Sequence, residues 1–293
     1  MEWIEALRQA IGFMEAHLLE DVTQEDVARN ANLSCMYFAR GFKIVTGYSP
    51  AEYIRCRRLY LAALDVLARG DKVIDIAYRY GYETPESFSK AFYRFHGATP
   101  TQLRAQPHKL HAFLPLRIHI TVAGGETMDC RVERMEAFSV IGLKREFESR
   151  DAYAALPAFW QEFWAWHRAR YRQAVEDTGH FWQYGVCMDG EGRAEDFAYM
   201  IAGVYGGGPV PQGLTVERIP AQLWAKFRCV GPMPGAMQAV NERIFKEWLP
   251  GNAAYELAGY TNVEWYGPGD NSGADYSCEI WIPIGRRAPG REA

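Results

Sequence analysis

Apolar residues in the first hundred positions recur every three or four residues, which is the period of an amphipathic helix. Near the N-terminus, one such face consists of Trp3, Leu7, Ile11, Met14 and Leu18. Two later segments, TQEDVARNANLSCMYFARGF (23–42) and DIAYRYGYETPESFSKAFYRFHG (75–97), each predict a helix, a tight turn and a second helix. The pattern therefore predicts two helix-turn-helix units in one chain.

Short polar residues mark where these helices begin and end. Ser34 and Thr84 are N-cap candidates for the second helix of each unit, and Pro85 suits the first helical position, where no backbone N–H is needed. The first turn contains Asn30–Asn32, and Asn tolerates the left-handed backbone that a tight turn needs. A further helix over 51–70 joins the units and forms a rod of roughly 26 Å. That length suits two recognition helices about one DNA turn, roughly 34 Å, apart.

Each second helix carries two Phe residues four positions apart, with polar and basic residues on its other side. The residues expected to face DNA are Met36, Tyr37, Arg40 and Lys43 in the first unit and Glu86, Ser89, Lys90 and Arg94 in the second. A single helical hairpin is more often plain packing between helices. Two matched hairpins joined by a spacer helix favour double-stranded DNA as the partner.

Composition limits the classes of protein that remain. With 293 residues, 48% of them hydrophobic, the chain is globular and long enough for more than one domain. A net charge of −4 argues against a general polyanion binder, so a DNA-binding surface must be a local basic stripe. The six widely spaced Cys predict reduced thiols, the N-terminus does not look like a secretory leader, and no apolar run is long enough to span a membrane. These features predict a cytoplasmic protein without a membrane partner.

The second unit carries a family resemblance. The segment IAYRYGYETPESFSKAFYRFHGATPTQLR (76–104) resembles the DNA-binding domain of the AraC/XylS family of bacterial transcription regulators, in its turn, its Phe pair and its closing Gly-x-x-Pro. The resemblance implies an all-α tandem helix-turn-helix domain over 1–106. It implies that, of the residues named above, those of the first unit face one major groove and Glu86, Lys90 and Arg94 face the next. Met36 and Ala39 depart from the family pattern, so the DNA sequence that is recognised does not carry over.

A change in composition separates this region from the rest of the chain. Residues 107–126 are rich in Pro, His and Gly and predict a linker. Within it, His108 and His111 have a spacing that metal sites use, but further ligands do not follow, so we expect a linker without metal. Beyond it, RVERMEAFSVIGLKREF (131–147) is similar to TVERIPAQLWAKFRCVG (215–231). A helix and two strand-like segments follow each copy, which predicts a duplicated strand-strand-helix-strand-strand unit with a groove between its halves.

A carboxylate in the last strand supplies candidate chemistry for that groove. Strand alternation places Glu279 and Trp281 on one face and Cys278, Ile280 and Ile282 on the other. Burying a carboxylate is costly unless a partner satisfies it, and most of the Trp residues lie in this half of the chain. The pattern is typical of a site for a flat or lipophilic cation, although a core of Trp residues and a plain ion pair to Glu279 explain it equally.

A second resemblance covers residues 127–287. The closing segment Glu279-Ile-Trp-Ile-Pro283 is similar to that of the GyrI-like small-molecule-binding domain. The resemblance implies that Glu279 projects into a ligand groove, with Trp281, Trp164 and Tyr266 as weaker candidates for its lining. Together with the AraC-type domain it implies a Rob-type architecture: a multidomain chain with an all-α tandem helix-turn-helix domain, an α+β duplicated ligand-binding domain, and a tail over 288–293.

Three classes of function follow. We expect a transcription regulator, acting as an activator, that senses a small and lipophilic cationic molecule, with RNA polymerase as a further candidate partner and without a cofactor. The alternative is a GyrI-like hydrolase of reactive natural products in which Glu279 acts as a general base. A third is a protein-interaction module whose groove binds nothing. The chain has no Ser-His-Asp order, phosphate-binding loop or metal cluster, so we do not expect an enzyme.

Overall fold

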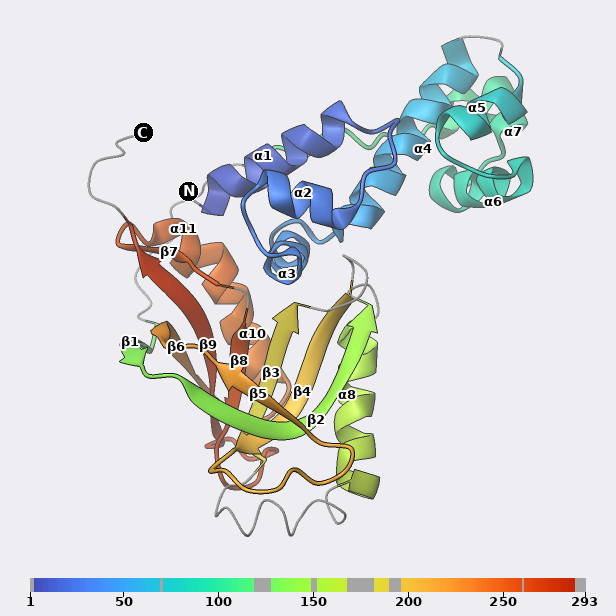
Figure 1. Cartoon of the computed structure of the whole chain (residues 1–293). Coiled ribbons are helices and arrows are strands. Elements are labelled where there is room, and N and C mark those ends of the chain that lie inside the picture. Colours follow the sequence, from blue (N-terminus) through green and yellow to red (C-terminus); the bar gives the residue numbers. More distant parts are fainter. Residues whose placement is uncertain are drawn as a thin grey trace.

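The structure is a computed structural model that describes residues 3–68, 71–118, 128–148, 152–167, 182–189, 196–259 and 261–287. The tail predicted over 288–293 and the last part of the predicted linker lie outside these residues. Figure 1 shows a helical N-terminal region above a curved sheet flanked by helices. The predicted multidomain architecture, with a helical region followed by an α+β region, is confirmed.

The N-terminal region consists of helices, as the period of its apolar residues predicts. Its elements are α1 (Trp3–Ala16), α2 (Gln24–Asn30), α3 (Cys35–Thr46), α4 (Pro50–Ala68), α5 (Val73–Arg79), α6 (Pro85–His96), α7 (Pro100–Ala105) and the 3₁₀ turn η1 (Pro107–Lys109). The pairs α2–α3 and α5–α6 are the two predicted helix-turn-helix units. Ser34 and Thr84 cap α3 and α6 by accepting from the backbone N–H of Tyr37 and Ser87. In the first turn Asn32 takes a φ of 53°, the left-handed conformation predicted for that turn.

Helix α4 is the predicted spacer, and ion pairs fix both of its ends. Near its start, Arg57 is 5% exposed and forms a bidentate pair with Glu15 of α1 at 2.7 and 2.8 Å. Near its end, Asp65 accepts from Arg79 of α5 at 2.7 Å. Arg57 is buried, so removing Glu15 would cost more than the pair itself stabilises, whereas the partly exposed pair of Asp65 and Arg79 contributes less.

The start of the predicted linker lies against the helices. Phe113 accepts a hydrogen bond from Arg57 through its carbonyl, and the ring of His111 stacks on Phe95 at 4.8 Å between centroids. The backbone N–H of His111 also donates to the Nδ1 atom of His96 at 3.2 Å. His111 therefore serves packing. Among the described residues, no group of three His, Cys, Asp or Glu side chains is placed to hold a metal.

The C-terminal region is built on a nine-stranded antiparallel sheet. Its strands are β1 (Cys130–Met135), β2 (Phe138–Glu148), β3 (Tyr184–Asp189), β4 (Asp196–Val204), β5 (Thr215–Ile219), β6 (Gln222–Val230), β7 (Tyr255–Leu257), β8 (Asn262–Tyr266) and β9 (Ser277–Arg286). Its helices are α8 (Ala152–Glu162) with the π turn η2 (Phe163–His167), and α10 (Gly235–Arg243) with the π turn η3 (Ile244–Trp248) and the short α11 (Leu249–Gly251). The first predicted helix of this region is therefore described as far as His167.

The order of the strands shows the predicted duplication. Eight strands run in the order β1-β6-β9-β8-β3-β4-β2-β5, and β7 pairs with β9 off this path. The order of the eight reads the same from either edge when each strand is replaced by its counterpart in the other copy. Strands β8 and β3 meet at the centre, where Gly185 pairs with Glu264. The edge strands are exchanged, because β1 of the first copy pairs with β6 of the second, and β5 of the second pairs with β2 of the first.

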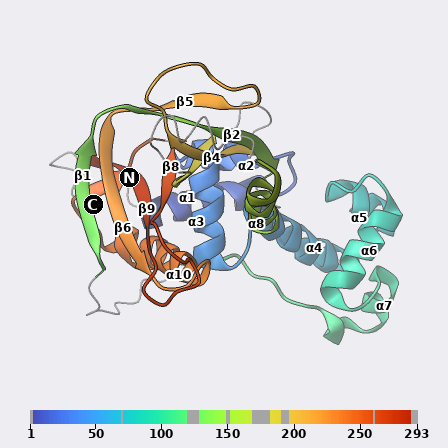
Figure 2. The ribbon, with the colours of Figure 1, turned by 90° about the horizontal axis from the view of Figure 1, so that it is seen from below.

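The first helix-turn-helix unit is joined to the sheet, whereas the second stands apart. Figures 1 and 2 show α3 between α8 and α10 on the face of the sheet that these helices flank. One continuous buried cluster includes Trp3, Phe38 and Phe42 from the helical region and Tyr199 and Ile280 from the sheet. The second unit has a separate core, formed around Phe88 and Phe92. In the part of the chain that the structure describes, no helix is long and apolar enough to cross a bilayer.

Candidate functional site

A buried carboxylate lies at the centre of the sheet, on its helix-flanked face. Glu264 of β8 is 8% exposed, and its Oε2 accepts from the hydroxyl groups of Tyr199 and Tyr266, both at 2.9 Å. Burial, and next the charge of Glu264, raise the pKa of both tyrosines well above its ordinary value. Both phenols therefore stay protonated and donate to the carboxylate.

A glycine makes this cluster possible. Gly185 of β3 pairs with Glu264, and a Cβ at that position would lie 2.1 Å from the hydroxyl oxygen of Tyr199. The missing side chain lets the phenol of Tyr199 cross β3 and reach the carboxylate. A glycine inside a strand often marks such a close approach.

Aromatic rings from α8 and η2 cover the tyrosines. The indole N–H of Trp160 donates to the hydroxyl of Tyr199 at 2.9 Å, and its ring lies 5.0 Å from that of Tyr266. Trp164 stacks on Trp160 at 6.1 Å and is 46% exposed. A carboxylate with aromatic rings beside it is suited to a cation, because charge attraction and cation–π contact act together where water is scarce.

A cation of the chain itself already lies at this carboxylate. The guanidinium of Arg40, from α3, is 3.7 Å from Oε1 of Glu264, and its side chain is 22% exposed. With its amide oxygen turned toward Arg40, Asn241 of α10 accepts from Nη2 at 3.1 Å and from Nε at 2.9 Å. Arg40 is therefore held from two sides by residues of the C-terminal region.

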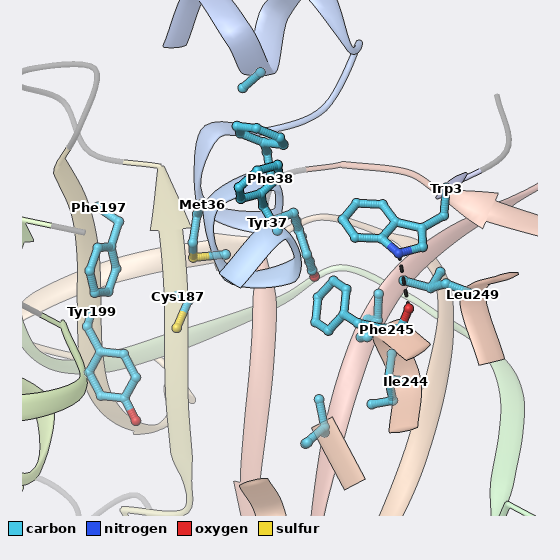
Figure 3. Close-up of a cluster of buried hydrophobic side chains, with 14 of the residues drawn as sticks. Trp3, Met36, Tyr37, Phe38, Cys187, Phe197, Tyr199, Ile244, Phe245 and Leu249 are labelled. Carbon is cyan, nitrogen blue, oxygen red and sulfur yellow. Dashed lines mark hydrogen bonds between the residues drawn. The ribbon is translucent and has the colours of Figure 1, made fainter. Parts of the chain in front are cut away.

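Buried apolar side chains of α3 also pack against residues of the C-terminal region, as Figure 3 shows. The indole N–H of Trp3 donates to the carbonyl of Phe245 at 3.0 Å, and the two rings lie 5.4 Å apart. A Cβ at Gly41 would lie 2.4 Å from the ring of Trp3 and 2.7 Å from that of Phe245. In the same view Met36 points toward β3, where Cys187 lies. Helix α3 thus packs against η3 and shares a buried cluster with the sheet.

The sheet separates the four residues that the sequence predicts as one effector site. The predicted alternation along β9 is confirmed: Trp281 packs on one face, and Cys278, Ile280 and Ile282 pack on the other. Trp164 and Tyr266, however, belong to the opposite face, with Glu264. The four predicted residues are thus divided between the two faces of the sheet, because alternation assigns residues to two faces without saying which face carries the helices.

Glu279 is fully engaged on its own face. It forms a bidentate pair with Arg131 of β1 at 2.7 and 3.0 Å, and it accepts from the indole N–H of Trp281 at 2.7 Å. Lys226 lies 4.0 Å from the centre of the Trp281 ring and pairs with Glu133. The plain ion-pair alternative for Glu279 is the one that the structure shows.

Glu264, Tyr199 and Trp160 were missed by sequence reasoning. The signal was present, because Asn262, Glu264 and Tyr266 alternate along a strand in the same way as the residues around Glu279. Asn241 gives no such signal, since a polar residue on a helix is ordinarily solvated.

The predicted DNA-facing residues divide between the two units. In α6, Glu86, Lys90 and Arg94 are exposed at successive turns and Ser89 is half-buried, so this face is open to solvent. In α3, Met36 is 8% and Tyr37 is 1% exposed, and Lys43 is half-buried like Arg40. The outward side of α3 does point away from its own unit, as predicted, but the C-terminal region covers it.

Comparison with known proteins assigns both regions. The family of integron-associated effector binding proteins matches residues 131–284, and a helix-turn-helix domain family matches residues 27–106. The uncharacterised regulator YbfP of Bacillus subtilis is 35% identical over 36% of this chain, and the chain covers 35% of its length. Regulatory protein SoxS of Escherichia coli is 32% identical over 33% of this chain, which covers 92% of SoxS.

The solved structure of SAV2435 bound to tetraphenylphosphonium covers 54% of this chain and 94% of its own, at 21% identity and a TM-score of 0.48. The chain spans about a third of the length of YbfP. The longer family match includes all nine strands of the sheet except the last residues of β9 and the first of β1. The chain belongs to the family of integron-associated effector binding proteins, with a GyrI-like C-terminal domain, and carries an AraC-type helix-turn-helix domain ahead of it.

Proposed function

We propose that this protein is a cytoplasmic transcription regulator that binds DNA through its helix-turn-helix units and a lipophilic organic cation through its C-terminal domain. The observation that carries the effector half is the buried Glu264 carboxylate, which two tyrosine hydroxyls orient and aromatic rings cover. The DNA half is supported by the open basic face of α6 and by the AraC-type family match. We propose the domain boundaries 1–106, 107–126 and 127–287, an activating role, and RNA polymerase as a further partner.

The chemistry of the Glu264 site favours a cation that is large and poorly hydrated. An ionised carboxylate that is removed from water needs a positive partner, and Arg40 fills that need in this structure. A small inorganic cation would require several oxygen ligands, whereas the surroundings of Glu264 are the rings of Trp160, Tyr199 and Tyr266. A bulky organic cation loses little hydration on entering such a site and gains cation–π contact.

The test is charge selectivity, measured by isothermal titration calorimetry. Tetraphenylphosphonium is compared with triphenylphosphine oxide, a neutral molecule with similar phenyl groups, on the full chain, on Glu264→Gln and on the matched variant Glu279→Gln. We expect the wild type to prefer the cation by roughly tenfold or more. We expect Glu264→Gln to lose that preference and Glu279→Gln to keep it. Equal affinity for both probes in the wild type, or a preference that depends on Glu279, would contradict the proposal.

The hydrolase alternative gains no support from the geometry. The carboxylate proposed as its general base, Glu279, has both oxygens bound by Arg131 and one also by Trp281. Both oxygens are therefore already engaged by donors of this chain, whereas a general base must reach the water that it activates. The relatives named above are regulators, so we propose sensing without turnover.

A further inference from the structure

We propose that helix α3 is a tethered ligand of the effector site, with Arg40 in the place of the effector cation. Seating of the first recognition helix and binding of a lipophilic cation then exclude each other. The cation releases α3, and only released α3 can enter DNA. This inference rests on the proposed function, because it assumes that Glu264 is the effector carboxylate.

Arg40 occupies the side of Glu264 that an effector cation would need. Glu264 has two hydroxyl donors on Oε2, and the charged partner on its Oε1 side is Arg40. A second cation at this carboxylate would place two positive charges within a few ångströms of each other in a region shielded from water. An effector cation can therefore approach Glu264 only if Arg40 leaves.

The shape of α3 carries the second step. None of the residues Cys35–Thr46 is exposed, whereas five of the residues Pro85–His96 in the matching helix α6 are. Gly41 permits α3 to pack this closely against the C-terminal domain, because any Cβ there would collide with Trp3 and Phe245. The packing of α3 thus depends on Gly41, which does not touch Glu264 in the described contacts.

The position of α3 carries the third step. A recognition helix must present its outer face to base edges in the major groove. Figure 2 shows α3 enclosed by α8, α10 and the curved sheet, and Met36 and Tyr37 on its outer face are buried. In the seated state the second unit alone can contact DNA.

Linkage then fixes the sign of regulation. The cation and the DNA both bind the released state, so each must raise the affinity of the other by the same factor. Couplings of this kind are typically between about 5-fold and about 150-fold. The second unit would therefore bind DNA without the effector, and the effector would allow the first unit to bind DNA as well.

The experiment uses the full chain and a matched pair of Gly→Ala variants in helices. Gly41→Ala inserts a methyl group into the seat, and Gly12→Ala places one on α1 where nothing lies within 4 Å. Tetraphenylphosphonium affinity is measured by calorimetry, and hydrogen exchange of the α3 and α6 backbones is followed by mass spectrometry. We expect Gly41→Ala to bind the cation about tenfold more tightly than the wild type, and Gly12→Ala to bind it equally. We expect saturating cation to speed exchange in α3 of the wild type but not in α6.

Different results separate the two proposals. If Gly41→Ala and the wild type bind the cation equally, and exchange of α3 does not respond to it, the inference is wrong while the cation site stands. If neither protein binds the cation with charge selectivity, the proposed function is wrong. Should Gly41→Ala fail to fold, Arg40→Gln removes the internal cation without adding volume. Its cation affinity should rise, and an unchanged or lower affinity would overturn the inference.

Discussion

The two helix-turn-helix units follow one plan and occupy two different environments. The N-caps Ser34 and Thr84 correspond fifty residues apart, and so do the Phe pairs and the left-handed glycines Gly47 and Gly97 that end α3 and α6. Their outer faces differ, however. At matching positions, the first unit has Met36, Tyr37 and Ile44 where the second has Glu86, Ser87 and Arg94. An apolar outer face packs on a protein surface and a polar one remains in water, so the two environments agree with the side chains that each helix presents.

The largest test of this contrast is a matched deletion in the two cores. Phe92 and Phe42 are both fully buried, and replacing either by Ala should cost about 3–5 kcal/mol of unfolding free energy. Because the second unit has its own cluster, which includes Leu59 and Val66 of α4, we expect Phe92→Ala to increase hydrogen exchange in α5–α7 and the second half of α4 but not in the sheet. Phe42→Ala should increase exchange in the sheet as well, because the first unit shares its cluster. If each variant increased hydrogen exchange only within its own unit, the first unit would be as independent of the sheet as the second.

A smaller effect is expected in DNA affinity. Lys90 of α6 is exposed, and Lys43 of α3 is half-buried. On a random-sequence duplex, Lys90→Ala should lower affinity several-fold and reduce the slope of log affinity against log salt by about 1. Lys43→Ala should change neither until saturating tetraphenylphosphonium is added, when the same loss should emerge. If both variants lost DNA affinity equally without the cation, α3 would contact DNA while it is packed against the C-terminal domain, and the two units would not differ in access to DNA.

The smallest expected effect concerns pH. His96 of the second unit is buried between the carbonyl of Leu59 and the N–H of His111, whereas the matching residue of the first unit is Thr46. Burial, more than its other contacts, lowers the pKa of His96 below its ordinary 6.5. The unfolded chain therefore takes up a proton that the folded one refuses, and stability is complete above about pH 6.5 and lost as the pH falls.

The measurement is urea unfolding followed in the second unit, between about pH 7.5 and about pH 5. Wild type should lose part of its stability over this range, and His96→Gln should lose less, since that variant lacks the titrating group. If both proteins respond equally to pH, His96 is not the cause.

Much of the fold follows from local pattern. The helices, their caps, the tight turn at Asn32 and the duplication of the sheet are all predictable, because each depends on residues within one element or on similarity between two. The candidate site is harder to predict. Alternation correctly divides β9 into two faces, but choosing Glu279 over Glu264 requires knowing where α8 and α10 lie. That is set by contacts between elements far apart in the chain.

The packing of α3 against the C-terminal domain was likewise not predictable from the pattern of apolar and polar residues. The residues Met36 and Tyr37 were expected to face DNA because in a helix-turn-helix unit the side away from the core is ordinarily the binding side. That they are apolar is visible in the sequence, but the partner surface around Phe245 and Asn241 forms only when the C-terminal domain folds. Neither the sequence of α3 nor that of the C-terminal domain has a periodic pattern that indicates such a surface.

The exchanged edge strands have a consequence for biosynthesis. Strand β1 leaves the ribosome early, yet its partner β6 lies in the second copy of the repeat, so its backbone groups wait unpaired until most of the domain has been made. Neither copy can complete its own sheet. The contacts within the helical region, such as that between Glu15 and Arg57, join residues closer in sequence than β1 and β6, so we expect this region to form first.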